Sequence, residues 1–288
     1  MINVTTRQLR IFEATARLGR LTQAAEEQSL SQSAASQSLR ELEQILDYRL
    51  FTREGRELKI TDDGNSVLPK IRQILGVVDT LKNPNVMSLR GALRIAASLT
   101  IASYILPGAV ARLLQKYPDI SPHIAITNTQ SVIQTLERGQ ALIGFIEGPC
   151  PPTELHMQPW REDSLVLFCH ADYPLAKAGV IDVDEIGQHR WILREPGSGT
   201  RTVFEVELQR LGGQVRSSLI LERQDAIKQS VKSGLGIGCL SSLSITEEVN
   251  SGEFVVLRSP MDLSRRFSIV THDADSQNPL IHALLSAL

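Results

Sequence analysis

Residues 31–42 constrain this chain more than any other stretch, because their pattern predicts a helix with two unlike faces. Ser31 is a favourable N-cap residue, since its hydroxyl can accept a hydrogen bond from an amide of the first turn. At 3.6 residues per turn, Ala35, Leu39 and Leu42 share one apolar face. The opposite face carries short polar side chains and one arginine, from Ser33, Ser36, Gln37 and Arg40. Such a face is either simply solvated or suited to the DNA major groove, where Gln and Ser contact base edges and Arg contacts guanine or phosphate.

The neighbouring segments favour the DNA interpretation, because together they predict a winged helix-turn-helix. Residues 21–28 predict a short helix, and only a tight turn separates it from the two-faced helix. Residues 5–17 predict a helix that begins with a capping box of Thr5 and Gln8. Residues 50–61 predict two strands joined by an Arg-rich glycine turn, which would form a wing beside the two-faced helix.

An ordered set of residues across this region resembles the LysR-type transcriptional regulators. The set comprises Leu9, Phe12, Gly19, Thr22, Ala24, Ala25, Ser31, Gln32, Ser36, Leu42, Glu43, Leu50, Phe51, Thr52, Arg53, Thr61 and Gly64. Two residues depart from the family pattern. Arg20 stands where the family commonly has a Ser that could cap the second helix, a loss of about 1 kcal/mol, and Gln28 stands where it commonly has Leu. The residues expected to contact DNA are Thr22, Gln32, Ser33, Ser36, Gln37, Arg40, Arg53 and Arg56.

Length and composition indicate a protein of at least two domains outside any membrane. The chain has 288 residues, of which 42% are hydrophobic, and no apolar run approaches the roughly 20 residues of a membrane helix. The first residues lack the basic flank and apolar core of a signal peptide, so we expect a cytoplasmic protein. Three widely spaced cysteines predict neither a disulfide framework nor a zinc site, and the histidines do not cluster at ligand spacing. We therefore expect no metal and no cofactor.

The charge balance limits how the chain can bind DNA. The net charge is −2, and residues 1–60 contain nine basic and eight acidic side chains, which leaves only +1. Affinity would therefore have to come from the placement of Arg40, Arg53 and Arg56 and from doubling the contacts in a dimer. This argues against a monomeric DNA-binding protein.

A long helix after the wing provides a route to that dimer. Apolar residues recur at spacings of four and three, with two leucines one heptad apart beside them: Val67, Ile71, Ile74, Val78 and Leu81, with Leu68 and Leu75. The pattern predicts a helix over residues 62–82 with a bend at Pro69, followed by a break at residues 83–85 and a hinge through Leu89. The helix could pack on its own wing domain or pair two subunits, and the stripe and the resemblance favour the second interpretation.

From Gly91 onward the sequence alternates predicted strands and helices, which is typical of a mostly parallel sheet with ligands at the carboxyl ends of its strands. The predicted strands are 93–97, 123–127, 141–146, 165–170, 191–193, 217–221, 236–240 and 266–271, and the predicted helices are 100–116, 129–138, 200–211 and 225–232. The resemblance implies a periplasmic-binding-protein-like effector domain, in which two α/β lobes joined by crossing strands close around a small ligand. The fold class expected is α/β.

The expected domains are a winged helix-turn-helix DNA-binding domain at 1–61, a linker and dimerisation helix with a hinge at 62–90, and a two-lobed effector-binding domain at 91–288. Lobe one would comprise 91–162 and 266–288, and lobe two 163–265.

Three stretches are expected to meet at the cleft between the lobes: residues 97–100, 128–129 and 194–201. Each places hydroxyls or amides where a strand passes into a helix, which suits an anion, although helix capping alone would explain each hydroxyl. The expected effector contacts are Ser98, Thr100, Asn128, Thr129, Glu147, Arg194, Glu195, Pro196, Ser198, Gly199, Thr200 and Arg201. Glu147 and Asp225 could instead order Arg194 or Arg201.

Residues 194–201 together with 146–149 resemble regulators of sulfur or carbon assimilation, which implies a sulfur oxyanion or a small carboxylate as effector. Two rival functions are an enzyme and an exported solute-binding protein. Residues 234–238 lack the glycine spacing of a dinucleotide loop, and no nucleophile or metalloprotease motif occurs at a fitting position. We therefore expect a ligand-responsive transcription factor and not an enzyme. Its expected partners are double-stranded DNA, a small anionic effector, RNA polymerase and further copies of the chain in a homodimer or homotetramer.

Overall fold

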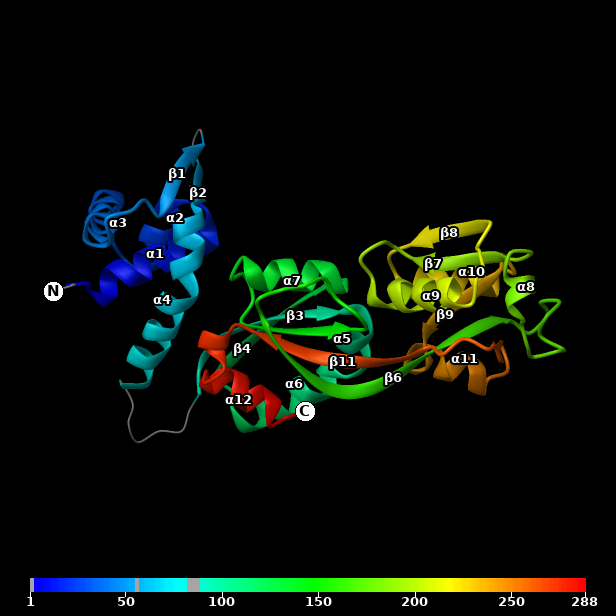
Figure 1. The fold of residues 1–288 in the computed structure, drawn as a ribbon. Helices are drawn as coiled ribbons and strands as arrows, with labels where there is room; N and C mark the ends of the chain where they lie inside the picture. The colour runs from blue at the N-terminus through cyan, green and yellow to red at the C-terminus, as the bar shows by residue number, and fades with distance from the viewer. Residues whose placement is uncertain (1–2, 55–56, 82–88) are drawn as a thin grey trace.

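The computed structural model describes residues 3–54, 57–81 and 89–288. The predicted contact Arg56 and the predicted break at residues 83–85 lie outside these residues. Figure 1 shows a small helical part with a hairpin at one end, a long helix, and two α/β lobes side by side. The elements of the first part are α1 (Thr6–Leu18), α2 (Leu21–Glu27), α3 (Gln32–Leu46), β1 (Phe51–Glu54), β2 (Glu57–Ile60) and α4 (Asp62–Leu81).

The local signals of the helix-turn-helix are present. The Thr5 amide donates to Gln8 Oε1 at 2.8 Å and the Gln8 amide donates to Thr5 Oγ1 at 3.3 Å, which confirms the capping box. The Ser31 hydroxyl accepts from the amide of Ala34 at 3.2 Å and caps α3. Arg20 occupies the N-cap of α2 without a side-chain capping bond. As expected from Arg in place of Ser at position 20, α2 therefore lacks a side-chain cap.

A buried carboxylate, Glu43, holds the wing against α3. Its side chain is only 9% exposed, and its Oε1 accepts from the amides of Leu50 at 2.8 Å and Phe51 at 3.3 Å. Its Oε2 pairs with Arg49 Nη1 at 3.0 Å. Because these contacts tie the start of β1 to α3, Glu43 positions the wing relative to α3.

The predicted apolar stripe on α4 divides between two environments. Leu68, Ile71 and Leu75 are buried in the core of the helix-turn-helix part. Ile74 of the stripe is 48% exposed, and Val77, which lies outside the predicted stripe, is 58% exposed. Part of the stripe therefore packs on its own domain, which is the first of the two interpretations, and Ile74 remains exposed.

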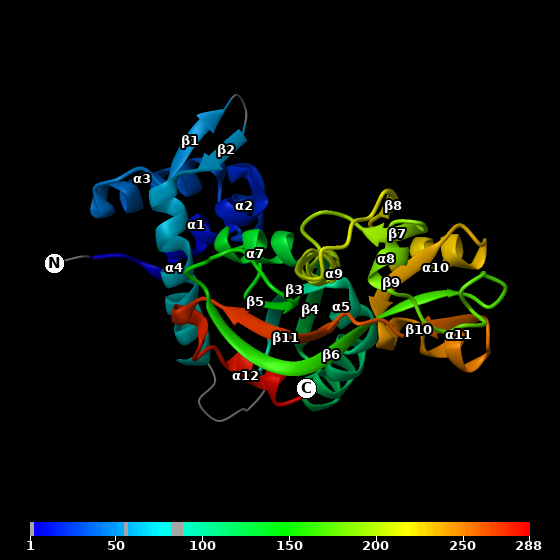
Figure 2. The same ribbon diagram turned by 45° about the vertical axis from the view of Figure 1, so that its right-hand side comes forward.

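The second part consists of two lobes joined by two long strands (Figures 1 and 2). Lobe one contains β3 (Gly91–Ser98), α5 (Leu99–Tyr104), α6 (Leu106–Lys116), β4 (Ile120–Thr127), α7 (Thr129–Glu137), β5 (Ile143–Glu147), η2 (Asp273–Asp275) and α12 (Pro279–Leu285). The crossing strands are β6 (His156–His170) and β11 (Ser264–Thr271). Lobe two contains α8 (Val183–Ile186), β7 (Arg190–Arg194), α9 (Gly199–Arg210), β8 (Ser217–Leu221), α10 (Gln224–Lys232), β9 (Ile237–Ser241), η1 (Ser242–Ser244), α11 (Thr246–Asn250) and β10 (Phe254–Leu257).

The sheet is mixed, with parallel strands inside each lobe and antiparallel crossing strands. Its order is β4-β3-β5-β11-β6-β9-β7-β8, with β10 beside β6. β3 is parallel to β4 and β5, and β7 is parallel to β8 and β9, whereas β11 is antiparallel to β5 and β6. Along β6, Ser164 still pairs with β11 and Leu165 already pairs with β9. The lobes are therefore joined where β6 changes partner.

One predicted helix was wrong. Residues 100–116 form two helices, α5 and α6, which are separated at Ile105. Pro107 lies in the first turn of α6. Amides of the first turn have no partner within the helix, so proline loses no hydrogen bond there and favours the start of a new helix. The consequence is that α5 is only six residues long and ends beside the cleft.

A charged cluster docks the N-terminal part on lobe one. Glu13 Oε1 of α1 lies 3.2 Å from Arg72 Nη2 of α4 and 3.6 Å from Arg94 Nη2 of β3. A Cβ on Gly139 would lie 2.8 Å from Arg72 Nη1, so α4 approaches lobe one closely at this point. Burial, followed by the charge of Arg94, lowers the pKa of Arg72 from 12.5 to about 10. In the part of the chain that the structure describes, no helix has the length and apolar character to cross a membrane.

Candidate functional site

The two faces of α3 are as predicted. Ala35, Leu39 and Leu42 are buried. The predicted DNA contacts on α3 and at the start of α2 lie outside this core: Gln32, Ser33, Gln37, Arg40 and Thr22 are exposed, and Ser36 is half-buried.

Two polar side chains of α3 bond to groups of their own helix. Gln37 Nε2 donates to Glu41 Oε1 at 3.0 Å, and Arg40 Nε donates to the Ser36 carbonyl at 3.2 Å. These bonds would have to be exchanged for base or phosphate contacts. Arg53 stands in β1 opposite Leu58, and its side chain lies outside the described part of the structure.

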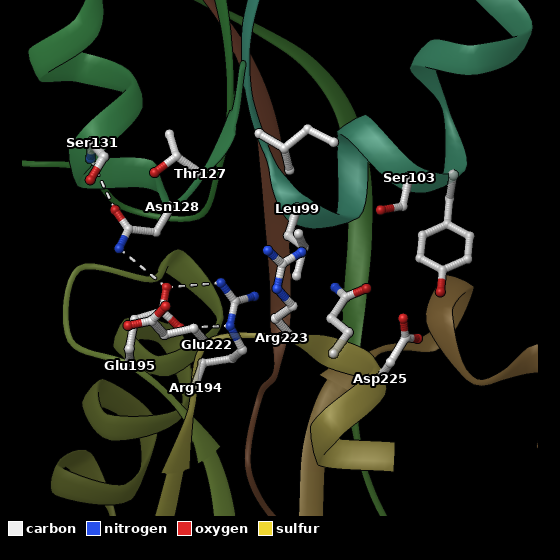
Figure 3. Close-up of a pocket in the computed structure, with 13 residues that line it drawn as sticks. Leu99, Ser103, Thr127, Asn128, Ser131, Arg194, Glu195, Glu222, Arg223 and Asp225 are labelled. Atoms are coloured by element: carbon white, nitrogen blue, oxygen red, sulfur yellow. Dashed lines mark hydrogen bonds and ion pairs between the residues drawn. The ribbon is translucent and has the colours of Figure 1, made fainter. Parts of the chain in front are cut away.

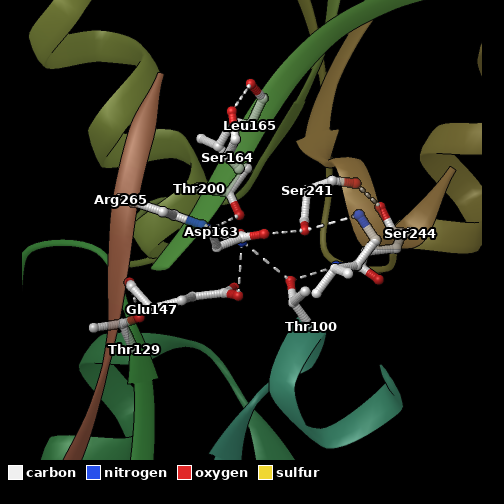
Figure 4. Close-up of polar contacts among 12 residues, drawn as sticks. Thr100, Thr129, Glu147, Asp163, Ser164, Leu165, Thr200, Ser241, Ser244 and Arg265 are labelled. Carbon is white, nitrogen blue, oxygen red and sulfur yellow. Dashed lines mark hydrogen bonds and ion pairs between the residues drawn. The ribbon is translucent and has the colours of Figure 1, made fainter. Parts of the chain in front are cut away.

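Between the lobes, one buried arginine gathers groups from distant parts of the chain. Arg265, at the start of β11, is 1% exposed, and its Nε donates to Asp163 Oδ2 at 2.6 Å. Its Nη1 donates to the Thr200 hydroxyl at 2.9 Å and its Nη2 to the Thr100 hydroxyl at 3.4 Å. Glu147 Oε2 lies 3.1 Å from Nη2 (Figure 4). The sequence interpretation missed Arg265, for which the only signal was a charged residue immediately before the predicted strand 266–271.

Two predicted effector residues have hydroxyls without any hydrogen-bond partner among the described residues. Ser98 and Ser198 stand at the N-caps of α5 and α9, are 0% and 1% exposed, and make no capping bond through their side chains. Helix capping therefore does not explain these two hydroxyls. Asn128 does cap α7, because its Oδ1 accepts from the Ser131 amide at 3.0 Å.

A second ion pair lies at the mouth of the cleft (Figure 3). Arg194, 2% exposed, donates from Nε to Glu195 Oε2 at 2.8 Å and from Nη2 to Oε1 at 3.0 Å. Asn128 Nδ2 donates to the same Oε1 at 3.1 Å, which links lobe one to lobe two. Burial alone would raise the pKa of Glu195, but the hydrogen bonds and charge of Arg194 outweigh it and hold that pKa below its ordinary value. Arg194 Nη1 remains buried without a partner among the described residues.

Glu147 and Asp225, which could have ordered Arg194 or Arg201, have other partners. Glu147 pairs with Arg265, and Asp225 lies 3.9 Å from Lys228 Nζ. Arg201 donates from Nε to Glu205 Oε1 at 2.7 Å, along its own helix. Pro196 is exposed beside them. The suggestion that Glu147 or Asp225 orders Arg194 or Arg201 was therefore wrong.

The lobes touch directly above this site. The Gln130 amide of lobe one donates to the Gly197 carbonyl of lobe two at 3.1 Å, and within lobe one the Thr129 hydroxyl donates to the Glu147 carbonyl at 2.9 Å. A Cβ on Gly199 would collide with the Glu147 carbonyl oxygen. Glycine is thus required where α9 meets lobe one.

A cleft of about 550 Å³ is lined by residues of both lobes. Lobe one lines it with Leu99, Tyr104 and Asn128, and lobe two lines it with the Arg194–Glu195 pair and Arg223 (Figure 3). Of the predicted effector residues, Asn128, Arg194 and Glu195 line the cleft itself. Ser98, Thr100, Thr129, Glu147, Ser198, Gly199 and Thr200 are buried between the lobes.

Neither metal ligation nor thiol chemistry is built into the described residues. They contain no group of three or more His, Cys, Asp or Glu side chains that could hold a metal ion. Cys169 and Cys239 are buried and free, and burial raises their pKa to about 11 and about 12. Thiols with raised pKa are poor nucleophiles at neutral pH.

Comparison with known proteins covers nearly the whole chain. The model for the bacterial regulatory helix-turn-helix protein, lysR family, matches residues 6–65, and the model for the LysR substrate binding domain matches residues 88–288. The uncharacterized HTH-type transcriptional regulator YeiE of Escherichia coli (strain K12) is 36% identical over 264 residues, which cover 90% of this chain and 88% of that protein. The RuBisCO operon transcriptional regulator of Allochromatium vinosum is 32% identical over 263 residues, which cover 89% and 85%.

Two solved structures share the fold. A full-length OxyR variant from Pseudomonas aeruginosa has a TM-score of 0.79 and 20% identity, covering 99% of this chain and 94% of that chain. The CcmR regulatory domain of Synechocystis PCC6803, in complex with 2-PG, has a TM-score of 0.63 and 27% identity, covering 68% and 95%. The predicted fold class, a winged helix-turn-helix followed by a two-lobed α/β domain, is confirmed by these matches.

Proposed function

This chain belongs to the LysR family of bacterial transcriptional regulators, and we propose that its effector is a small anion, either a sulfur oxyanion or a small carboxylate, held between the two lobes. Regulators of this family bind DNA and small-molecule effectors, form oligomers and are not enzymes. The chemistry between the lobes narrows the choice of effector.

The observation that carries the proposal is a set of buried hydrogen-bond donors that lack acceptors. The hydroxyls of Ser98 and Ser198 and the Nη1 of Arg194 have no partner among the described residues. A buried donor left unpaired destabilises a fold by about 1–3 kcal/mol, so such groups in a native protein call for a specific explanation. The oxygens of an anion would supply acceptors for such donors.

The buried threonines strengthen this argument. The hydroxyls of Thr100 and Thr200 both accept from Arg265, and that of Thr100 accepts also from Gln224 Nε2 at 2.9 Å. Thr100 Oγ1 thus accepts two hydrogen bonds and Thr200 Oγ1 accepts one, and each hydroxyl has its own hydrogen left to donate. The start of α9 adds backbone amides at a helix N-terminus, which favour negative charge.

Two relatives support an acid from carbon metabolism as readily as a sulfur oxyanion. The CcmR regulatory domain, 27% identical, was solved in complex with 2-PG, and a relative 32% identical regulates a RuBisCO operon. The segments 194–201 and 146–149 resemble the regulators of sulfur or carbon assimilation. We propose that binding favours one of two arrangements of the lobes, which requires that the effector bind that arrangement more tightly.

For the DNA-binding end we propose that the polar face of α3 reads the operator in the major groove, while Arg53 and Arg56 of the wing contact phosphates. The small net charge of residues 1–60 favours paired binding, and the exposed Ile74 and Val77 of α4 are suited to subunit contact in a homodimer or homotetramer. The site of action would be the cytoplasm, where the DNA is, and RNA polymerase would be the partner met at a promoter.

The anion proposal can be tested by thermal shift of the full-length chain with sulfite, sulfate, thiosulfate, phosphate and small carboxylates. An anion at one hundred times its Kd should stabilise the native protein by about 2.7 kcal/mol. Ser198→Ala should reduce that shift because it removes a donor, whereas Ser251→Ala, at an exposed serine after α11, should leave it unchanged. The absence of a shift with every anion would eliminate the proposal.

A further inference from the structure

We propose that Glu147 makes this site selective for an anion that carries its own hydrogen-bond donor, such as a hydroxy- or amino-substituted carboxylate or a protonated oxyanion. The inference rests on the proposed anion site and adds which anions that site accepts.

The first observation is an acceptor without a donor. Glu147, at the end of β5, is 1% exposed, and its Oε2 receives no hydrogen bond from any described residue. Arg265 Nη2 approaches this oxygen to 3.1 Å as an ion pair, but without the alignment of a hydrogen bond. A buried carboxylate oxygen normally has a hydrogen-bond donor, so this oxygen has capacity for one more partner.

The second observation places that acceptor beside the donors of the proposed site. The same nitrogen, Arg265 Nη2, lies 3.1 Å from Glu147 Oε2 and 3.4 Å from the Thr100 hydroxyl (Figure 4). The other terminal nitrogen of Arg265 holds the Thr200 hydroxyl at 2.9 Å. An anion bonded to the Thr100 hydroxyl would therefore have part of its structure within reach of the Glu147 carboxylate.

The third observation is an imbalance of buried charge. Arg265, Glu147 and Asp163 have side chains that are 1%, 1% and 2% exposed, so one positive and two negative groups leave a net charge of −1 away from water. Asp163 is satisfied, because it accepts from Arg265 Nε at 2.6 Å and from the Ser241 hydroxyl at 2.8 Å. Glu147 is the carboxylate with an oxygen to spare.

These observations separate two kinds of anion. An anion without a donor would leave Glu147 Oε2 unpaired. It would also be repelled by the negative charge of Glu147, because screening is weak in a buried site. An anion with an O–H or N–H group would donate to Oε2 while its oxygens accept from the surrounding hydroxyls. If Glu147 served only to hold Arg265, the two kinds of anion would bind equally well.

The test is calorimetric titration of the full-length protein with anion pairs that have equal charge and differ in the donor. At pH 8, glycolate is compared with acetate, and hydrogen phosphate with sulfate. Because the extra hydrogen bond is made to a charged carboxylate, the anion with the donor should bind on the order of tenfold tighter than its partner in the pair. This applies to each pair for which binding is detected. Equal affinities within the pairs would overturn the inference while leaving the anion proposal intact, and binding of none of these or of the other screened anions would overturn both.

Two variants assign the preference to Glu147. Glu147→Gln removes the negative charge that would accept the hydrogen bond from the anion, so the preference should shrink to less than about twofold. Glu147→Asp, which retains the charge but withdraws the carboxylate by one methylene, should also weaken it and serves if the first variant does not fold. The matched control is Glu195→Gln, a carboxylate that already has partners, which should change both members of a pair by the same factor. A preference that survives in the Glu147 variants would overturn the inference.

Discussion

Replacing Glu13 by Gln should loosen the docking of the helix-turn-helix part on lobe one. Glu13 has a side chain that is 16% exposed, and its carboxylate lies 3.2 Å from Arg72, 3.6 Å from Arg94 and 3.5 Å from Arg17. Gln keeps the shape and removes the charge. Arg72 and Arg94, whose side chains are 13% and 25% exposed, would then lose the negative charge that lies near both of them.

The expected magnitude follows from the distances and the exposure. Removing one partner of a fully buried ion pair destabilises a protein by about 3–5 kcal/mol, whereas exposed pairs contribute about 0.2–1 kcal/mol. Because this cluster is partly exposed, and the Gln amide oxygen retains one acceptor for Arg72, we expect a loss of about 2 kcal/mol. That corresponds to a roughly thirtyfold rise in the population of the undocked state.

Hydrogen exchange of the full-length chain measures this opening, because amides protected by the contact exchange from the undocked state. In Glu13→Gln, the amides of α1 should exchange roughly thirtyfold faster. The control is Glu27→Gln, which removes a carboxylate that is 40% exposed and pairs with Arg17 at 2.6 Å. It should change exchange by less than about threefold, as expected for an exposed pair. If the two variants exchange alike, the docking role of Glu13 is refuted.

Four further predictions concern the DNA-binding and effector ends. Arg53→Ala should weaken binding to every duplex and reduce the slope of log K against log salt by about 0.9; an unchanged slope would exclude a phosphate contact. Gln37→Ala should reduce the discrimination between operator and random DNA in a competition assay, and equal losses on both would count against base readout. Gly199→Ala should lower stability in denaturant unfolding by more than about 2 kcal/mol because its Cβ would strike the facing carbonyl oxygen, whereas Gly108→Ala, whose Cβ meets nothing closer than 3.6 Å, should be neutral or stabilise by up to about 1 kcal/mol. Because the pKa of Glu195 is held below its ordinary value of 4.5, the stability from its ion pair should be present above that pH and lost as pH falls through the folded pKa; the difference in unfolding free energy between wild type and Glu195→Gln should shrink in that acidic range, and a constant difference would contradict the assignment.

Much of the fold was predictable because its signals are local. The capping box joins Thr5 and Gln8, which are three positions apart, and the cap of α3 joins Ser31 and Ala34 at the same separation. The predicted strand 217–221 coincides with β8. These features depend on bonds between neighbours in the chain, which propensity and spacing can predict. The error at residues 100–116 was also local, since Pro107 was available as a signal for a second helix.

The candidate site was predictable only as a set of segments. The expectation that hydroxyls at the starts of three helices belong to one cleft came from the order of strands and helices. Which of them bond to their own helix could not be predicted, because Asn128, Ser98 and Ser198 occupy the same kind of N-cap position and only Asn128 caps its helix through its side chain. Asn128 Oδ1 accepts from the Ser131 amide, whereas the hydroxyls of Ser98 and Ser198 are buried without a partner among the described residues.

The sequence by itself determined the two-faced helix α3, the order of the elements and the family. The tertiary structure alone decided that Arg265 occupies the site, since its bond to Thr100 joins residues 165 positions apart. It also decided that Glu147 pairs with Arg265 and that part of the α4 stripe packs on its own domain. The physical reason is that helix caps and amphipathic faces arise within a few residues, whereas the burial and pairing of a charge depend on segments that only the folded chain brings together.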